Sequence, residues 1–286
     1  MSPDDHYQNL KRIIAAVGGK AKRINVIMPF LYESRQHKRS SRESLDCALA
    51  LQELTHMGVD NIITFDAHDP RVQNAIPLSG FETVRPTYQF VKGLLDRYDD
   101  LIIDSDHMMA ISPDEGATER AVYLANVLNL DMGMFYKRRD YTRVVNGRNP
   151  IVAHEFLGSS VEGKDVIILD DMISSGDSIL DVAKQLKSRN AKRIFAAATF
   201  GLFTNGLDKF DEAYESGLID GVLTTNLIYQ TPELLSRPYY INCDMSKYVA
   251  LMIDTLNHDG SISDILDPSE RIQVCVEEYK KAHGQL

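Results

Sequence analysis

The chain has 286 residues, 44% hydrophobic and 25% charged, which is ordinary usage for one or two globular domains with a full-sized core. Its net charge of −10 argues against general nucleic-acid binding and indicates that local basic clusters serve anionic ligands. No apolar run approaches membrane-spanning length, no signal-peptide pattern opens the chain, and the three cysteines form no metal-binding spacing. We therefore expect a cytoplasmic protein that binds neither nucleic acid nor membrane.

The first part of the chain alternates between predicted helices and predicted buried strands. We expect helices at Asp5–Val17 and Ser44–His56, and strands at Arg23–Met28 and Asn61–Phe65. The stretch 32–44 follows the first strand and is rich in basic residues. It is either a solvated surface loop or a mobile loop that binds polyphosphate.

A histidine between two acids follows the second strand, in the sequence Asp66-Ala67-His68-Asp69. A single histidine is usually structural, but ligand sites in α/β sheets are built where strands end. We therefore predict that His68 contacts a metal or a phosphate. The stretch 70–86 is predicted to be irregular, with a domain boundary near residue 86.

The second part of the chain repeats the plan of the first. Between a strand and a helix stands Asp114-Glu115-Gly116, which indicates a Mg²⁺ or ligand site at Asp114, with a simple helix cap as the alternative. A second basic stretch, Lys137 to Arg143, follows a later strand. Alternating strands and helices predict parallel sheets covered by helices, in two related domains. The expected strands are Met108–Ser112, Met132–Tyr136, Ile151–Phe156, Arg193–Thr199 and Gly221–Thr224, and the expected helices are Tyr88–Arg97, Thr118–Leu128, Ser246–Thr255 and Ser269–His283.

The most informative stretch is Val166–Ile179, VIILDDMISSGDSI. A buried strand runs into the paired acids Asp170 and Asp171, then a loop of small residues, then an amphipathic helix. The loop amides and the start of the helix favour an anion, and a glycine there lets the backbone approach a phosphate closely. The loop residues are Ser174, Ser175, Gly176, Asp177 and Ser178.

The paired acids of this stretch need a partner other than phosphate, which they would repel. Vicinal sugar hydroxyls donate hydrogen bonds and fit, so the stretch predicts a site for a phosphorylated ribose. Neither a Walker loop nor a GxGxxG fingerprint is present. The alternative is an ordinary strand-turn-helix whose acids cap the helix.

This loop resembles the PRPP-binding loop shared by type I phosphoribosyltransferases and ribose-phosphate pyrophosphokinases, although Ser175, Gly176 and Asp177 replace the more usual Thr-Ala-Gly or Thr-Cys-Gly. With its other motifs, from about Ile24 to Thr255, the chain resembles the ribose-phosphate pyrophosphokinase family. The family's ATP loop resembles MPFLYESRQHKRSSRES, and its Asp-x-His element resembles ITFDAHD. Its Ser-Pro-Asp segment resembles ISPDEG, and its flexible catalytic loop resembles YKRRD.

The resemblance implies a role for each of these motifs. ATP would be bound by Arg35, Gln36 and His68, and Mg²⁺ by His68 and Asp114. The catalytic cations would be Lys137 and Arg139. Ribose 5-phosphate would be bound by Asp170, Asp171, Ser174, Ser175, Gly176, Asp177 and Ser178.

The resemblance also implies an α/β fold of two phosphoribosyltransferase-like domains, each a mainly parallel sheet flanked by helices. The first would cover 1–86 joined by 243–286, and the second 87–242. The implied reaction transfers diphosphate from Mg-ATP to the C1 hydroxyl of ribose 5-phosphate, in a homo-oligomer built from dimers and extending to a hexamer. A phosphoribosyltransferase, or a non-catalytic homologue that regulates a full-length synthetase, is the alternative.

Three features depart from the family pattern. His37 stands where the family normally has Asp, and the loop 137–150 is longer or differently composed than usual. A Phe-x-Asp-Gly-Glu stretch, which in the family contacts adenine across a subunit interface, does not occur in this sequence. The resemblance therefore predicts near-normal binding of ribose 5-phosphate with weak ATP binding and slow turnover.

Overall fold

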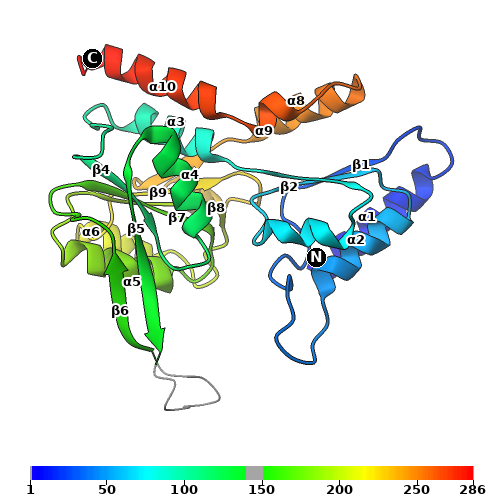
Figure 1. Cartoon of the computed structure of the whole chain (residues 1–286), viewed down its shortest axis with the longest axis horizontal. Coiled ribbons are helices and arrows are strands. Elements are labelled where there is room, and N and C mark those ends of the chain that lie inside the picture. The colour runs from blue at the N-terminus through cyan, green and yellow to red at the C-terminus, as the bar shows by residue number, and fades with distance from the viewer. Residues whose placement is uncertain (1, 140–150, 286) are drawn as a thin grey trace. The chain divides into compact units, whose positions relative to one another are not determined.

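The computed structural model describes the backbone of residues 2–139 and 151–285, and their side chains except at 137–139 and 151–154. The chain forms two compact units, Met1–Pro86 and Thr87–Leu286, and each is described by itself (Figure 1). The predicted boundary near residue 86 coincides with this division. No helix within the described residues is both long and apolar enough to cross a membrane.

The first unit contains a three-stranded parallel sheet in the order β1-β2-β3. Its core packs the sheet against both helices through residues such as Ile14, Leu54 and Ile62. Ser2 caps α1 reciprocally with Asp5, which fixes where that helix begins. The elements are α1 (Pro3–Val17), β1 (Asn25–Met28), α2 (Asp46–His56), β2 (Asn61–Phe65), the 3-10 helix η1 (Pro70–Ala75) and β3 (Gly80–Val84).

The prediction of an irregular stretch at 70–86 was wrong, because η1 and β3 lie within it. The strand β3 has no clean hydrophobic alternation, and only Phe81 and Val84 are buried in it. It forms because all five of its residues pair in parallel with β2. Tertiary pairing here overrides a weak local pattern.

The second unit is built on a seven-stranded sheet in the order β10-β9-β8-β7-β4-β5-β6. Every neighbouring pair is parallel except β5 and β6, which are antiparallel at one edge. The strands are β4 (Met108–Ser112), β5 (Asp131–Arg139), β6 (Ile151–Leu157), β7 (Asp165–Ile173), β8 (Ile194–Gly201), β9 (Gly221–Thr225) and β10 (Tyr240–Cys243). The helices are α3 (Thr87–Arg97), α4 (Thr118–Leu128), α5 (Asp177–Lys187), α6 (Asp208–Glu215), α7 (Pro232–Leu235), α8 (Ser246–Asn257), α9 (Ser263–Leu266) and α10 (Ser269–Ala282).

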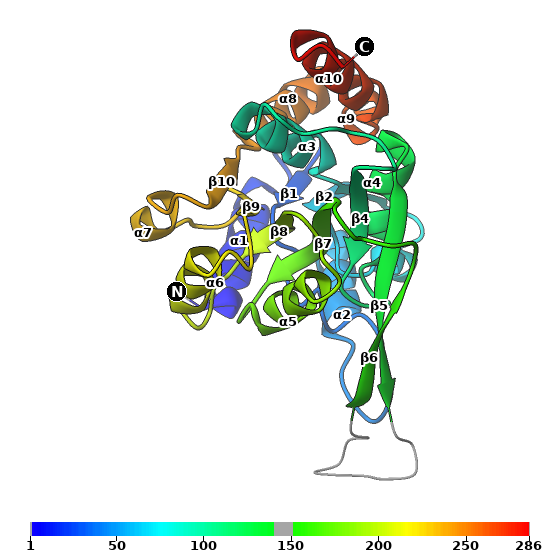
Figure 2. The same ribbon diagram turned by 90° about the vertical axis from the view of Figure 1, so that its left-hand side faces the viewer.

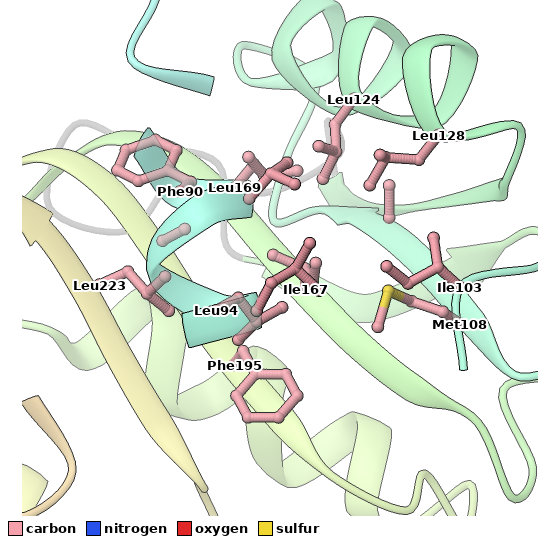
Figure 3. Close-up of a cluster of buried hydrophobic side chains, with 14 of the residues drawn as sticks. Phe90, Leu94, Ile103, Met108, Leu124, Leu128, Ile167, Leu169, Phe195 and Leu223 are labelled. Atoms are coloured by element: carbon pink, nitrogen blue, oxygen red, sulfur yellow. The ribbon is translucent and has the colours of Figure 1, made fainter. Parts of the chain in front are cut away.

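Helices cover both faces of this sheet, and strand β7 shows how its residues divide between them. Ile167 and Leu169 join the cluster formed with α3, α4 and α10, of which Figure 3 shows the centre. Val166 and Ile168 join the cluster formed with α5 and α6 on the opposite face (Figure 2). This two-residue alternation buries both faces of the strand, as expected for the middle of a parallel sheet.

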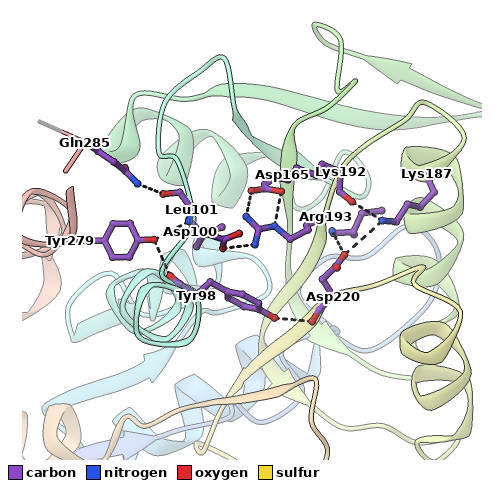
Figure 4. Close-up of polar contacts among 11 residues, drawn as sticks. Tyr98, Asp100, Leu101, Asp165, Lys187, Lys192, Arg193, Asp220, Tyr279 and Gln285 are labelled. Atoms are coloured by element: carbon purple, nitrogen blue, oxygen red, sulfur yellow. Dashed lines mark hydrogen bonds and ion pairs between the residues drawn. The ribbon is translucent and has the colours of Figure 1, made fainter. Parts of the chain in front are cut away.

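The C-terminal segment packs in the second unit, whereas the sequence led us to expect that 243–286 would join the first domain. Ile272 and Val276 of α10 belong to the core cluster of the second unit. The Tyr279 hydroxyl donates to the Tyr98 carbonyl and accepts from the Leu101 amide, each at 2.9 Å (Figure 4). These contacts lie more than 170 positions apart in sequence, so local patterns could not indicate them.

Two strands extend further than predicted. The β7 strand continues through the paired acids to Ile173, which pairs with Gly201 of β8. The β5 strand continues past Tyr136 to Arg139 by antiparallel pairing with β6. The backbone of Lys137 and Arg139 therefore belongs to a strand, although a loop was expected there. The side chains of both residues, and the stretch 140–150, lie outside the described part of the chain.

Candidate functional site

The carboxyl ends of β4 and β7 bring three acids together in the second unit. The two strands are parallel neighbours, with Ile111 opposite Ile168, so both end at the same edge of the sheet. Asp114 follows β4, while Asp170 and Asp171 lie in the carboxyl-terminal half of β7. The sequence had assigned these acids to separate roles, and the topology places them at one edge.

Asp114 stabilises the turn that leads into α4. Its carboxylate accepts hydrogen bonds from the amides of Gly116 at 2.9 Å and Ala117 at 3.3 Å, both on the same oxygen, Oδ1. These bonds stabilise the turn before α4, whose N-cap residue is Ala117 and which receives no side-chain cap, so Asp114 is not a simple helix cap. The charge of Asp114 also raises the pKa of Asp170. Holding the turn and binding a ligand are compatible roles at this residue.

The pKa of Asp170 is strongly raised by its surroundings. Burial raises its pKa first, and the neighbouring charges of Asp171 and Asp114 raise it further. The amide of Asp171 donates to the Asp170 carboxylate at 2.8 Å, which offsets only part of this cost. Among the residues that the structure describes, no lysine or arginine forms an ion pair with Asp170. Such a site favours hydrogen-bond donors or a cation supplied from outside.

The loop between β7 and α5 has the shape of an anion site. Gly176 has φ of +84° and is the residue before α5, so the amides of the first helical turn follow it directly. A Cβ on Gly176 would lie 2.4 Å from the ring of Phe210, so the close packing of α6 also requires glycine. The Ser174 carbonyl accepts from the Thr204 amide at 3.0 Å, which ties the loop to the segment after β8.

An ion pair stands at the start of α5. The Asp177 carboxylate accepts a hydrogen bond from Lys209 Nζ at 2.5 Å and another from the Ser175 hydroxyl at 2.9 Å. Both contacts lower the pKa of Asp177, that of Lys209 most. An acid is therefore present, and neutralised, beside the turn that would hold a phosphate.

In the first unit, the end of β2 turns sharply to place His68. Asp66 has φ of +42°, an uncommon conformation for a residue other than glycine. The next amide, that of Ala67, donates to the Thr83 hydroxyl of β3 at 2.9 Å, which holds the turn. His68 follows at the carboxyl edge of this sheet and is half-buried.

Asp69 and His37 complete this cluster. The guanidinium of Arg71 binds both oxygens of Asp69 and lowers its pKa to about 2. His37 Nε2 lies 3.6 Å from Asp69 Oδ2, and its ring centroid lies 5.2 Å from that of His68. Burial lowers the pKa of His37. The predicted ATP residues Arg35 and Gln36 precede it, with Arg35 exposed and Gln36 half-buried.

The predicted metal residues His68 and Asp114 belong to different units, so their pairing stays a prediction. Across the described residues, no group of three or more histidine, cysteine, aspartate or glutamate side chains is arranged to hold a metal ion. Mg²⁺ usually takes only one or two carboxylates from a protein and its other ligands from water and phosphates. One or two of Asp114, Asp170 and Asp171 could serve in this way, because a divalent cation would relieve the repulsion that Asp114 and Asp171 exert on Asp170.

Comparison with known proteins identifies the family. The model of the phosphoribosyl transferase domain matches residues 84–226, and that of the N-terminal domain of ribose phosphate pyrophosphokinase matches residues 1–58. Ribose-phosphate pyrophosphokinase of Shewanella oneidensis is 30% identical over 263 residues, covering 89% of this chain and 78% of the relative. The chain belongs to the ribose-phosphate pyrophosphokinase family. The family predicted from the motifs is thereby confirmed.

Two further relatives show the extent of the likeness. The Mycoplasma genitalium ribose-phosphate pyrophosphokinase is 31% identical over 229 residues, covering 79% of this chain and 65% of the relative. The crystal structure of phosphoribosylpyrophosphate synthetase from Mycobacterium smegmatis aligns with a TM-score of 0.74 and 25% identity, covering 89% of this chain and 78% of that one. The expected α/β fold of two phosphoribosyltransferase-like domains is confirmed. The chain spans about two thirds of the length of the Mycoplasma relative.

Two side chains near the candidate sites were not predicted as site residues. Lys209 lies 32 positions after Asp177, and no spacing pattern links them. His37 was noted only as a departure from the family, and its approach to Asp69 and His68 depends on how the basic stretch folds. The signal for His37 was its place in that stretch, after a strand end.

Proposed function

We propose that the chain is a ribose-phosphate pyrophosphokinase that transfers the diphosphoryl group of Mg-ATP to the C1 hydroxyl of ribose 5-phosphate, giving PRPP and AMP. The observation that carries this proposal is the paired acids of β7 beside the anion-binding turn of α5. Family membership supports it, since the relatives carry that name. The match to the N-terminal pyrophosphokinase domain disfavours a simple phosphoribosyltransferase.

In this proposal Asp170 and Asp171 bind the ribose. Carboxylate oxygens accept hydrogen bonds, so the 2- and 3-hydroxyls of the sugar would donate to them. Donors at these acids relieve the repulsion that raises the pKa of Asp170. The 1-hydroxyl is left free to attack, and the 5-phosphate lies on the turn at Ser174–Ser178.

ATP binding is proposed for residues of the first unit, and the catalytic cations are proposed on strand β5. Arg35, Gln36 and His68 would contact ATP, and Lys137 and Arg139 would stabilise the charge that builds on the transferring group. Transfer of this kind depends on positioning and cations more than on covalent catalysis. Alanine at Lys137 or Arg139 should therefore lower kcat strongly with little change in KM, as expected for contacts made in the transition state.

The proposed cofactor is Mg²⁺, with His68 and Asp114 as its protein contacts. Bound to the triphosphate, the ion would neutralise phosphate charge and orient the chain of phosphates. Within the second unit, Asp114 would add the negative charge that attracts it, because one of its oxygens makes no backbone cap. We also propose the homo-oligomer built from dimers that the family resemblance implies.

The direct test is steady-state AMP release by the purified chain, with ATP, ribose 5-phosphate and Mg²⁺. We expect AMP and PRPP in equal amounts, dependent on all three components. A protein that binds ribose 5-phosphate and releases no AMP, alone or with added Mg²⁺, would instead be the non-catalytic homologue. Release of diphosphate from PRPP on addition of a nucleobase would indicate a phosphoribosyltransferase.

A further inference from the structure

The ion pair between Asp177 and Lys209 stands where the proposed function requires a phosphate. Asp177 is the first residue of α5, and its carboxylate contacts Lys209 Nζ and the Ser175 hydroxyl. The two side chains are 53% and 51% exposed. An exposed ion pair contributes little to folding, so stability gives little reason for it.

The position of Lys209 is fixed by core packing. The next residue, Phe210, is fully buried and lies against Gly176, so close that a Cβ there would fall within 2.5 Å of two ring atoms. Phe203 packs edge-on against Phe210, with the ring centroids 5.2 Å apart. The start of α6 is therefore held against the proposed phosphate-binding turn, Ser174–Ser178. This packing places Lys209 beside that turn.

Asp177 creates an electrostatic need for that lysine. A carboxylate at the start of a helix stabilises the helix, but it also repels a phosphate dianion bound to the same amides. In the free protein Lys209 neutralises this charge. An ammonium on a flexible stem can bind a phosphate as a point charge while staying close to its carboxylate.

We propose that Lys209 is a phosphate-contacting, specificity-determining residue, whose ammonium group bridges Asp177 and the 5-phosphate of the bound sugar. This inference rests on the proposed ribose 5-phosphate site. It means that the site selects a phosphate monoester over a neutral sugar by a lysine supplied from α6, in addition to the loop amides. The acid at position 177 makes the lysine necessary, because without it the turn would carry an uncompensated negative charge.

The test compares Lys209→Met with Lys184→Met by calorimetric titration of ribose 5-phosphate. Lys184 is a matched control, because it also forms an exposed ion pair with an acid of α5. Its Nζ lies 3.2 Å from Asp181 Oδ1. We expect Lys209→Met to weaken ribose 5-phosphate binding by about tenfold or more, as for loss of one charge-assisted contact, and Lys184→Met to leave it unchanged. Lys209→Arg should retain most of the affinity. Equal affinity of the two methionine variants would overturn the proposal.

A double variant separates contact with the phosphate from neutralisation of the acid. Adding Asp177→Asn to Lys209→Met should recover part of the lost affinity, because the repulsion is removed, and leave a deficit of several-fold, because the contact is still missing. Full recovery would overturn the contact. Failure of the unsubstituted chain to bind ribose 5-phosphate would overturn the proposed function and this inference together, whereas normal binding with an unaffected Lys209→Met variant overturns this inference alone. Matched thermal unfolding of the variants confirms that they are folded.

Discussion

The two ends of strand β7 carry acids that meet opposite electrostatic conditions. At its start, Asp165 is 2% exposed and both of its oxygens bind the guanidinium of Arg193, at 2.9 and 2.6 Å (Figure 4). At its other end, Asp170 lies beside two more acids, which raise its pKa, and has no ion-pair partner among the described residues. The same residue type is neutralised at one end and left in repulsion at the other.

The difference separates acids that hold the fold from acids that serve a ligand. Arg193 also binds Asp100 at 2.7 Å, so the start of β7 is tied to the segment after α3. A buried ion pair of this kind is costly to break on one side. The buried charge of Asp170 at the far end costs stability while no ligand is bound, and a protein retains such a charge only where it has a use.

The largest expected effect is on stability, at the start of the strand. Asp165→Asn removes the charge that pairs with Arg193 and should lower the free energy of unfolding by about 3–5 kcal/mol, because a half-buried guanidinium loses its closest partner. Urea-induced unfolding followed by circular dichroism measures this. Asp181→Asn, at an exposed pair on α5, is the control and should change stability by less than about 1 kcal/mol. A similar small loss in both variants would contradict the structural role of Asp165.

The next effect is on binding, at the end of the strand. Asp170→Asn combined with Asp171→Asn should weaken ribose 5-phosphate binding by about 3 kcal/mol or more, because two charge-assisted hydrogen bonds are lost at roughly 1.5–3 kcal/mol each. Isothermal titration calorimetry on the folded variant gives the value. Unchanged affinity in this double variant would refute the assignment of the ribose site.

A smaller effect concerns the pH dependence of stability. Since the pKa of Asp170 is raised in the folded state, folded protein holds more protons than unfolded protein as pH rises above the ordinary aspartate value. Stability should therefore fall with rising pH through that window, and Asp170→Asn should remove this fall and be about 1 kcal/mol more stable near neutrality. Unfolding curves at a series of pH values test this. A variant that is less stable than the unsubstituted chain at neutral pH would show that Asp170 is not in repulsion.

The smallest effect is expected in the first unit, where Asp69 is neutralised by the exposed Arg71. The pKa of Asp69 is lowered to about 2, so its stabilising contribution is present above the ordinary aspartate pKa and is lost as pH falls toward 2. Arg71→Met should have little effect on stability at neutral pH, because the guanidinium is 78% exposed, and should flatten the acid limb of the stability curve. An unaltered acid limb would show that Arg71 does not stabilise the charge of Asp69.

Much of the fold followed from local patterns, and the misses have physical causes. The stretch 166–179 was predicted in detail because strand, acids, loop and helix are continuous in sequence. The strand β3 and the place of α10 were missed because they depend on pairing and packing with distant segments. The start of β7 was not distinguished from its end, since only the folded chain brings Arg193 to Asp165.

The residues of the candidate site also fall into those that local sequence identifies and those that only the folded chain brings together. The paired acids and the proposed phosphate-binding turn were identified from residues that adjoin one another. Lys209 could not be found, because its contact with Asp177 depends on how Phe210 packs against Gly176. The assignments of Arg35, Gln36, His68, Lys137 and Arg139 came from family resemblance and stay predictions.

The most direct test of the comparison is to titrate ribose 5-phosphate into Asp165→Asn and Asp170→Asn at a temperature where both are folded. The account predicts a crossed result: Asp165→Asn binds with the affinity of the unsubstituted chain although it unfolds more readily, whereas Asp170→Asn binds at least tenfold more weakly although it is equally or more stable. If Asp170→Asn kept full affinity, or if folded Asp165→Asn lost it, the division of β7 into a structural end and a ligand-binding end would be contradicted.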